Sequence, residues 1–391
     1  MARRLVSQLR LLWRRLPLMD RWLIAELTGP LLFGIAAFTA VSLSVGVVFE
    51  LVRKVAEAGL PPLVAMQVLS LRLPGFLVLS FPMATLMATL LGYSRLSGSS
   101  ELTALRSIGV STRRMVMPAL LVAALMTGLT FVFNDLIVPS ANLAAANTLD
   151  SALGRALASE RGSNVVYSRF ARIGPDRNNE SSPPSLAQLF YARRFLKGDM
   201  LHVTLLDFSH PGQQQILTAD SAVWNDARSM WEFRQGRIVN ISVDSGVATS
   251  ADFDRYLYPF TRDPVEMGKL PSDATQMTVS QAIRAQRLLE ASGDRREARR
   301  LSVRIQEKFA FPTICLVFGL IGSSLGVRPN SRTSRSQGFG ISVLLIFGYY
   351  LMSFIFSSLG IKGTIFPFLA AWSPVALGLA AGVYLLRKAS R

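Results

Sequence analysis

The sequence predicts an α-helical integral membrane protein with six transmembrane helices and an inserted periplasmic β-jelly-roll domain. Two observations carry this prediction. The chain has 391 residues, of which 50% are hydrophobic and 17% are charged, whereas about a quarter of the residues of a soluble domain are charged. The apolar residues also stand in long blocks toward the two ends of the chain, while the middle has the composition of a soluble domain.

Six apolar blocks are long enough to cross a bilayer, because about 20 residues of helix span a hydrocarbon core of roughly 30 Å. None shows the alternation of a membrane β-strand, so we expect helices, which satisfy their own backbone hydrogen bonds in lipid. The apolar stretch 62–73 should form the outer part of the second helix, which we expect to break near Pro74 because proline lacks the amide donor. The blocks are Trp22–Leu51, Pro74–Tyr93, Met115–Val138, Val303–Val327, Gly338–Leu359 and Ile365–Leu386.

Lysine and arginine near the helix ends predict the orientation, because short cytoplasmic loops carry an excess of them. One side of the bundle has only Arg53, Lys54 and Lys362 in its short loops. We therefore expect a multi-pass protein of the bacterial inner (plasma) membrane with both termini cytoplasmic and the inserted domain periplasmic. The basic residues of the cytoplasmic side are Arg3, Arg4, Arg10, Arg14, Arg15, Arg21, Arg95, Arg106, Arg113, Arg114, Arg328, Arg332, Arg335, Arg387, Lys388 and Arg391.

Composition also argues against several functions. The net charge is +17, but basic and acidic residues nearly balance within the segment 141–300. The sequence lacks the basic stripe interleaved with aromatic residues that would predict nucleic-acid binding. The single cysteine, Cys315, lies in a membrane block, and His202 and His210 lack the pattern of a zinc site. No phosphate-binding GxxxxGK[ST] loop is present. We expect no catalytic residue, no metal and no cofactor in this chain.

Four segments follow from these patterns: an N-terminal membrane half (1–140), a β-jelly-roll-like domain (141–277), a helical connector (278–302) and a C-terminal membrane half (303–391). Alternating apolar residues in the second segment predict strands separated by turns at Lys197-Gly198-Asp199, Asn225-Asp226 and Gln235-Gly236. Strands at this spacing are typical of a sandwich or jelly roll. In the connector, Thr278 and Gln281 have the spacing of a capping box, and Gly293 should end the helix.

A short amphipathic helix is expected at about 97–110, between the second and third membrane helices. Ser99 or Ser100 can cap it, and Gly109 stops it. A helix with one narrow apolar face either docks in a groove of a partner or lies on the lipid surface, and the pattern alone favours neither. That face consists of Leu102, Leu105 and Ile108.

The segment that contains this short helix, and the chain around it, resembles the LptF/LptG (YjgP/YjgQ) family of lipopolysaccharide-export permeases. The resemblance covers nearly the whole chain and is weakest over 170–260. It rests first on "SSELTALRSIGVS", which is similar to the cytoplasmic coupling segment of the family. The other matching stretches are "LPGFLVLSFPMATLMATLLGYSRLS", "NDLIVPSAN", "EKFAFPTICLVFGLIGSSLG", "RTSRSQGFGISVLLIFGYYL" and "LAAWSPVALGLAAGVYLL".

The resemblance implies a transmembrane permease subunit of an ATP-binding-cassette exporter that extracts lipopolysaccharide, or a related glycolipid, and passes it to a periplasmic bridge. The implied partners are a cytoplasmic ATPase dimer, a second permease subunit (the same chain or a paralogue), a periplasmic β-jelly-roll bridge protein and the lipid itself. ATP is used by the partner ATPase, and the permease is not an enzyme.

The family's motif positions also imply site residues. For docking of the ATPase they imply polar contacts from Glu101 and Arg106 and an apolar plug formed by Leu102, Leu105 and Ile108. For lipid binding, the basic candidates at the outer ends of the helices are Arg53, Lys54 and Arg72, since a basic residue there suits an anionic head group. The sequence supports equally well that Arg53 anchors the helix at the membrane interface instead of binding a head group.

Aromatic residues of the β domain are a further set of candidates. Phe190, Phe208 and Phe233 either form its ordinary core or line an apolar groove for acyl chains.

Two other functional classes stay open on the sequence. A membrane scaffold would couple a cytoplasmic ATPase to a periplasmic partner without moving lipid. A membrane hydrolase would use a Ser/Lys pair, but none of the few lysines stands in a nucleophile motif.

Overall fold

The structure, a computed structural model, describes residues 17–152, 165–171, 185–196, 199–210, 212–225, 228, 230–242, 246–260, 273–327 and 335–390. The chain divides into two compact units. The first consists of 1–52, 72–138 and 303–391, and the second of 53–71 and 139–302. We call the first the membrane unit, and we call the sheet of the second the β domain.

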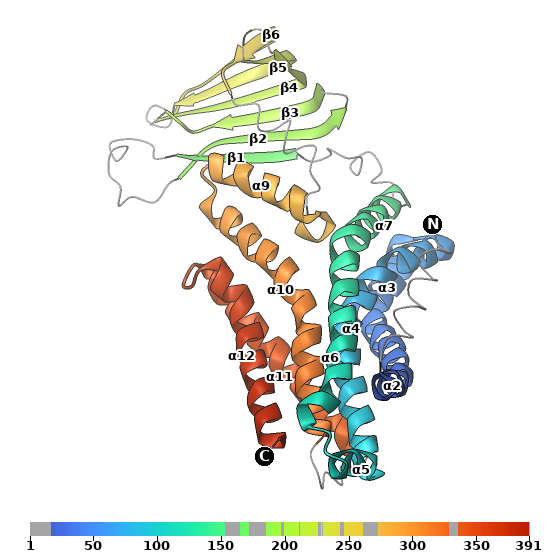
Figure 1. Ribbon diagram of the computed structural model, residues 1–391. Helices are drawn as coiled ribbons and strands as arrows, with labels where there is room; N and C mark the ends of the chain where they lie inside the picture. Colours follow the sequence, from blue (N-terminus) through green and yellow to red (C-terminus); the bar gives the residue numbers. More distant parts are fainter. Residues whose placement is uncertain are drawn as a thin grey trace. The chain divides into compact units, whose positions relative to one another are not determined.

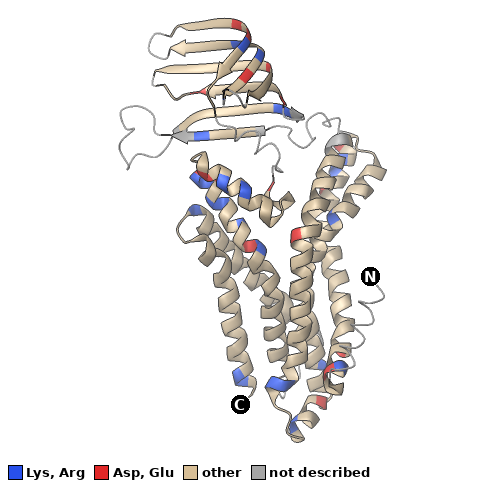
Figure 2. Ribbon diagram, turned by 45° about the horizontal axis from the view of Figure 1, so that its top comes forward, with Lys and Arg blue, Asp and Glu red and all other residues tan. Residues whose placement is uncertain are grey.

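Six helices of the described chain are long and apolar enough to cross a membrane, as the sequence predicts. Figure 2 shows that the middle sections of these helices carry few charged residues. The helical elements are α2 (Leu18–Leu43), η1 (Ser44–Val48), α3 (Phe49–Ala58), α4 (Pro62–Gly98), α5 (Glu101–Ser107), α6 (Thr112–Val132), η2 (Phe133–Ile137), α7 (Val138–Ala152), α9 (Val279–Ala291), α10 (Arg295–Gly326), α11 (Arg335–Lys362) and α12 (Pro367–Ala389) (Figure 1).

The expected break in the second membrane helix is wrong. Helix α4 runs without interruption from Pro62 to Gly98 and contains both Pro74 and Pro82. A proline removes one backbone hydrogen bond, but neighbouring helices and local adjustments compensate for it in membrane helices. The prolines of α6, α10 and α12 also lie inside helices that continue through them.

Close approach of helices holds the membrane unit together. A Cβ atom added at Gly319 of α10 would lie 2.5 Å from the Cβ of Ala123 of α6, and one added at Gly326 would lie 2.6 Å from the Cβ of Tyr93 of α4. Small residues allow such contacts between backbones in lipid, where no hydrophobic effect drives helices together. The buried core includes Leu23, Tyr93 and Met115.

The β domain contains one six-stranded antiparallel sheet whose strands pair in sequence order (Figure 1). Inserted between helices, this sheet fits the expected jelly-roll-like domain. The expected turns at Lys197-Gly198-Asp199 and Asn225-Asp226 fall between β2 and β3 and between β4 and β5, partly outside the described residues. The strands are β1 (Val165–Ala171), β2 (Ser185–Leu196), β3 (Asp199–Asp207), β4 (Gln213–Asn225), β5 (Met230–Ser242) and β6 (Ala248–Tyr258).

The expected turn at Gln235-Gly236 is wrong, because β5 continues through both residues. Gln235 instead has a left-handed backbone, with φ of 48°. The pairing skips Gln235, and it skips one residue of each of β2, β3, β4 and β6 in the same row, Asp254 being the one on β6. We call the part of this row on β2 to β5 the crease; its residues are Arg193, His202, Asp220 and Gln235.

At the crease the buried side of the strands shifts by one residue. In β3, Val203 and Leu205 are buried beyond it and Met200 before it, and between them His202 has φ of 51°. Strands that change direction at bulges or bends make the corners of orthogonally packed sheets. The crease is therefore a bend that runs across the sheet.

The bend folds the sheet onto itself. Phe190 on β2 and Trp231 on β5 have ring centroids 5.0 Å apart, although strands three positions apart in a flat sheet are separated by about 14 Å. Tyr258 on β6 likewise donates a hydrogen bond to Asp207 on β3. The aromatic core of the domain lies between the two halves of the folded sheet.

The connector helix follows the sequence closely. Thr278 accepts a hydrogen bond from the backbone of Gln281, and the Gln281 side chain bonds back to the Thr278 backbone, which confirms the capping box. Gly293 has φ of 82° and follows Ser292, the C-cap of α9.

Candidate functional site

The short helix α5 lies between α4 and α6 and is the first candidate site. It is bounded by two left-handed residues, Ser100 with φ of 63° and Gly109 with φ of 90°. Gly109 ends the helical segment as expected. Ser100 occupies the N-cap position, but its side chain makes no capping hydrogen bond. Ser99 instead donates to the carboxylate of Glu101 over 2.6 Å.

The expected apolar plug is only partly exposed. Leu102 is 1% exposed and belongs to the buried core of the membrane unit, and Leu105 packs against the same core. Ile108 is 75% exposed. The narrow apolar face thus points mainly into the chain, because the helix has to bury most of that face to stay attached to the bundle. The sequence prediction that all three residues face a partner needs this correction, because only Ile108 of the three is exposed.

Arg106 also turns inward. Its guanidinium donates a hydrogen bond of 2.7 Å to the carbonyl oxygen of Val327, directly after the end of α10. This bond joins α5 to the end of α10, and its two residues are 221 positions apart in the sequence. Arg106 therefore fixes the position of α5, while Glu101 is exposed.

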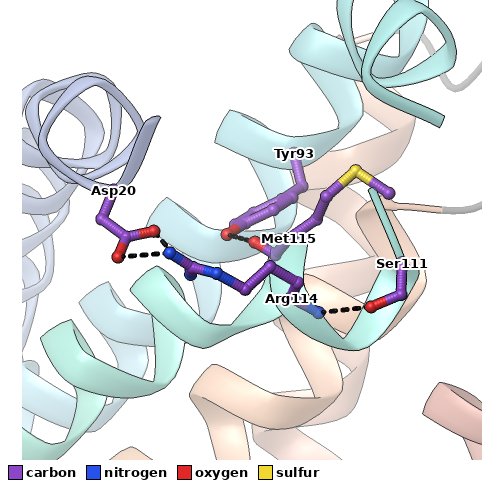
Figure 3. A network of polar contacts seen from close by, with 5 residues as sticks. All are labelled: Asp20, Tyr93, Ser111, Arg114 and Met115. Atoms are coloured by element: carbon purple, nitrogen blue, oxygen red, sulfur yellow. Dashed lines mark hydrogen bonds and ion pairs between the residues drawn. The ribbon is translucent and has the colours of Figure 1, made fainter. Parts of the chain in front are cut away.

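A polar network ties the start of α6 to the start of α2 (Figure 3). The guanidinium of Arg114 donates to both carboxylate oxygens of Asp20, over 2.7 and 2.9 Å. Asp20 is 4% exposed. Beside it, the hydroxyl of Tyr93 donates to the carbonyl oxygen of Met115 over 2.7 Å, and Ser111 accepts from the backbone of Arg114. A bidentate pair of this kind adds geometric specificity as well as energy.

A second ion pair joins α2 to α4, between Glu26 and Arg95. Sequence reasoning missed both carboxylates. The only available signal was that Asp20 and Glu26 are acidic residues at the edge of an apolar block, where an unpaired charge is unfavourable. Ion pairs thus tie α2, α4 and α6 to one another, and a hydrogen bond ties α5, which carries the exposed Glu101, to the end of α10.

The basic candidates for lipid contact are placed differently. Arg53 lies on α3 with an exposed side chain and forms an ion pair with Glu57, with 3.9 Å between Nε and Oε2. Lys54 and Arg72 are half-buried. Contact of these three residues with lipid stays a prediction.

Two of the aromatic candidates lie in the closed core of the β domain. Phe190 and Phe233 are both 0% exposed, and their ring centroids are 6.3 Å apart. In this conformation they meet across the folded sheet and leave no surface for an acyl chain. Phe208 is half-buried just beyond β3 and is not part of this core. A role of these rings in lipid binding stays a prediction, and for the first two it requires the fold to open.

A buried carboxylate closes the folded sheet. Asp207 is 5% exposed and accepts hydrogen bonds from Gln188, over 3.0 Å, from Tyr258, and from the backbone and hydroxyl of Ser209. Burial alone raises the pKa of Asp207, but the hydrogen bonds from Ser209, Tyr258 and Gln188 outweigh it and hold the pKa below its usual value. Burial, together with the hydrogen bond to Asp207, raises the pKa of Tyr258.

Comparison with known proteins bears on these arrangements. The chain matches the model of the family described as lipopolysaccharide export system permease LptF/LptG, over residues 21–388. No curated protein matches the chain. The matched residues include α4, α5, α6, the β domain, α9, α10, α11 and all but the last residue of α12, and the match begins one residue after Asp20. This chain belongs to the LptF/LptG family, the membrane permease component of lipopolysaccharide export.

Proposed function

We propose that the chain is the permease subunit of an ATP-binding-cassette exporter that extracts lipopolysaccharide, or a related glycolipid, from the inner membrane and passes it to a periplasmic bridge protein. The family and the six membrane helices support a transporter permease. The helix α5 is the observation that carries the coupling to an ATPase. It presents Glu101 and, directly after its last residue, the 75% exposed Ile108, while Leu102, Leu105 and Arg106 hold it in the bundle.

The ties of α5 supply a route for mechanical coupling. A partner that moves α5 also moves the end of α10 through Arg106, and α6 follows α5 directly in the chain. Helix α6 in turn holds α2 through Arg114 and Asp20. A docking helix needs such attachments, since a helix that is free to hinge would absorb the motion instead of transmitting it.

The proposed orientation follows from the distribution of lysine and arginine. Both termini and α5 face the cytoplasm, and the β domain faces the periplasm. The ATPase dimer, a second permease subunit and the bridge protein are the proposed partners. Arg53, exposed on α3, is the basic residue best placed for an anionic head group, since its pairing with Glu57 is long and open to solvent.

Docking is tested by placing a charge on the exposed apolar residue. Ile108→Asp should prevent the cognate ATPase from co-purifying with the full chain, because the new carboxylate would lose its water in an apolar groove. Leu18→Asp is the matched control, since Leu18 is 81% exposed at a helix end outside α5. Normal co-purification of the ATPase with Ile108→Asp would exclude α5 as the docking site.

A scaffold that couples the ATPase to a periplasmic partner without moving lipid is the alternative. The closed aromatic core of the β domain favours it, because Phe190 and Phe233 offer no groove in this conformation. ATP-dependent release of glycolipid from proteoliposomes holding the purified complex separates the two. Release supports the permease, and ATP hydrolysis with no release over many turnovers supports the scaffold.

A further inference from the structure

A hollow of about 490 Å³ lies along the crease on the outer face of the β domain. Its size falls within the range of small-molecule sites. We propose that this hollow, which we call the crease hollow, binds an uncharged saccharide. The polar and aromatic side chains that line it include Tyr191, Arg193, His202, Asp220, Gln235 and Arg237.

The lining comes from two neighbouring rows of the sheet. One row is the crease itself, with Arg193, His202, Asp220 and Gln235 on four successive strands. The other contains Tyr191 and Arg237, two residues away along β2 and β5. Alternate residues of a strand point to the same face, so both rows present their side chains to one hollow. Adjacent strands are about 4.8 Å apart, and the four crease residues therefore extend over about 14 Å, the length of a short oligosaccharide rather than of a single ion.

The left-handed positions of the crease are occupied by long polar side chains. A backbone with positive φ favours glycine, because a side chain there is strained. A bend needed only for folding would be served best by glycine at both positions. This chain has His202 at φ of 51° and Gln235 at φ of 48°, and both side chains line the hollow. Retention of strained side chains at one surface site points to a binding role.

The crease residues are also available to bind a ligand. Arg193, His202, Asp220 and Gln235 are all exposed. None of the four makes a side-chain hydrogen bond or an ion pair within the part of the chain that the structure describes. Together they offer donors and acceptors side by side, which is what vicinal hydroxyl groups need.

Charge decides among the possible ligands. The two arginines of the hollow are balanced by two carboxylates, Asp220 and Asp252, and Arg237 is already paired with Asp252 over 2.6 Å. A phosphate would require an excess of positive charge, and a metal cation an excess of acidic ligands. A neutral ligand rich in hydroxyl groups matches the mixed donors and acceptors, and the ring of Tyr191 offers an apolar face to its C–H groups.

This inference rests on the proposed function in one respect, since a glycolipid moving along the β domain would bring its sugars to the outer face while its acyl chains seek apolar surface. Binding of the saccharide itself does not depend on transport. A chain that binds sugar but releases no lipid would refute the proposed function and leave the crease hollow in place.

The test is saturation-transfer NMR on the full chain in a sugar-free detergent. The probe is a neutral oligosaccharide made from the glycolipid of the producing bacterium by removing its acyl chains and its charged groups. We expect transfer to the sugar protons in the wild type and at least a tenfold weaker affinity in Gln235→Gly and in His202→Gly. Glycine keeps the left-handed backbone at both positions, so these variants should fold.

Gln214→Gly is the matched control, since Gln214 is an exposed glutamine on β4 outside the hollow. Unchanged affinity in this control, with loss in the two crease variants, supports the proposal. Absence of transfer to the neutral oligosaccharide in the wild type would overturn it. So would equal binding by all three variants, or displacement of the sugar by inorganic phosphate at equimolar concentration.

Discussion

Among the described residues, each unit of the molecule buries one carboxylate almost completely, and the two are stabilised in different ways. Asp20 in the membrane unit is 4% exposed and is neutralised by the guanidinium of Arg114. Asp207 in the β domain is 5% exposed, and within the described residues it accepts hydrogen bonds from uncharged groups alone, those of Gln188, Ser209 and Tyr258. Asp20 is held by an opposite charge, and Asp207 by several oriented dipoles.

The difference teaches how much each carboxylate depends on a single partner. Loss of Arg114 leaves Asp20 as an uncompensated charge beside apolar helices, whereas loss of any one donor leaves Asp207 with the others. Removal of one partner of a buried ion pair typically destabilises a protein by about 3–5 kcal/mol. Removal of one neutral hydrogen bond to a buried group typically destabilises it by about 1–3 kcal/mol.

The largest effect is expected for Arg114→Ala. We expect destabilisation of the membrane unit by about 3 kcal/mol, at the lower end of the range for buried pairs because the Arg114 side chain is 40% exposed. Thermal unfolding of the full chain in detergent measures it. The double variant with Asp20→Asn should recover most of the loss, since the charge is removed with its partner. A double variant as unstable as the single one would show that Arg114 acts through packing and not through Asp20.

Tyr258→Phe should have a smaller effect. The change keeps the aromatic core and removes one donor to Asp207, so we expect a loss of about 1–2 kcal/mol. Hydrogen–deuterium exchange of β2 and β3 should report this loss. These strands carry Gln188 and Asp207, which contact Tyr258 of β6 only when the sheet is folded onto itself. The control Tyr256→Phe removes a hydroxyl on the same strand that does not bond to Asp207. Equal exchange in both variants would show that the Tyr258 hydroxyl does not hold the two halves of the sheet together.

The effect of pH on the stability of the β domain should be smaller again at ordinary pH, where Asp207 stays ionised. The folded pKa of Asp207 lies below its usual value, and the unfolded pKa of aspartate is about 3.9. The stabilising contribution is therefore fully present above about pH 5 and is lost as the pH falls through the folded pKa. Tryptophan fluorescence of the full chain between pH 7 and pH 3 measures it, since Trp231 lies in the core of this domain. Asp207→Asn should remove this component, and an unaltered acid transition in that variant would assign it to other carboxylates.

The smallest effect is expected for the exposed pair of Arg237 and Asp252. Their charged atoms are 2.6 Å apart, but both side chains are largely exposed, and such pairs contribute little to stability because water screens them. Asp252→Asn should leave the unfolding temperature unchanged in low and high salt. A clear drop confined to low salt would show that the outer face of the crease is stabilised by charge as well as by the fold.

Two residues of α5, Leu102 and Arg106, show where prediction from the sequence ends. The helix, its boundary at Gly109 and its place between two membrane helices follow from local pattern. The directions of Leu102 and Arg106 do not, because each depends on a partner far away in sequence, the bundle core for Leu102 and the Val327 carbonyl for Arg106. The same holds for Asp20 and Arg114, which are 94 residues apart.

The sequence by itself determined the six membrane helices, the inserted β domain, the capping box at Thr278 and the family, because each depends on length, periodicity or residue types close together in the chain. Tertiary structure alone decided that α4 passes through Pro74 and that β5 bends at Gln235 instead of turning. It also decided that Phe190 and Phe233 meet across a folded sheet. Those outcomes depend on the balance between a local backbone penalty and the packing of distant surfaces, and only the folded chain brings those surfaces together.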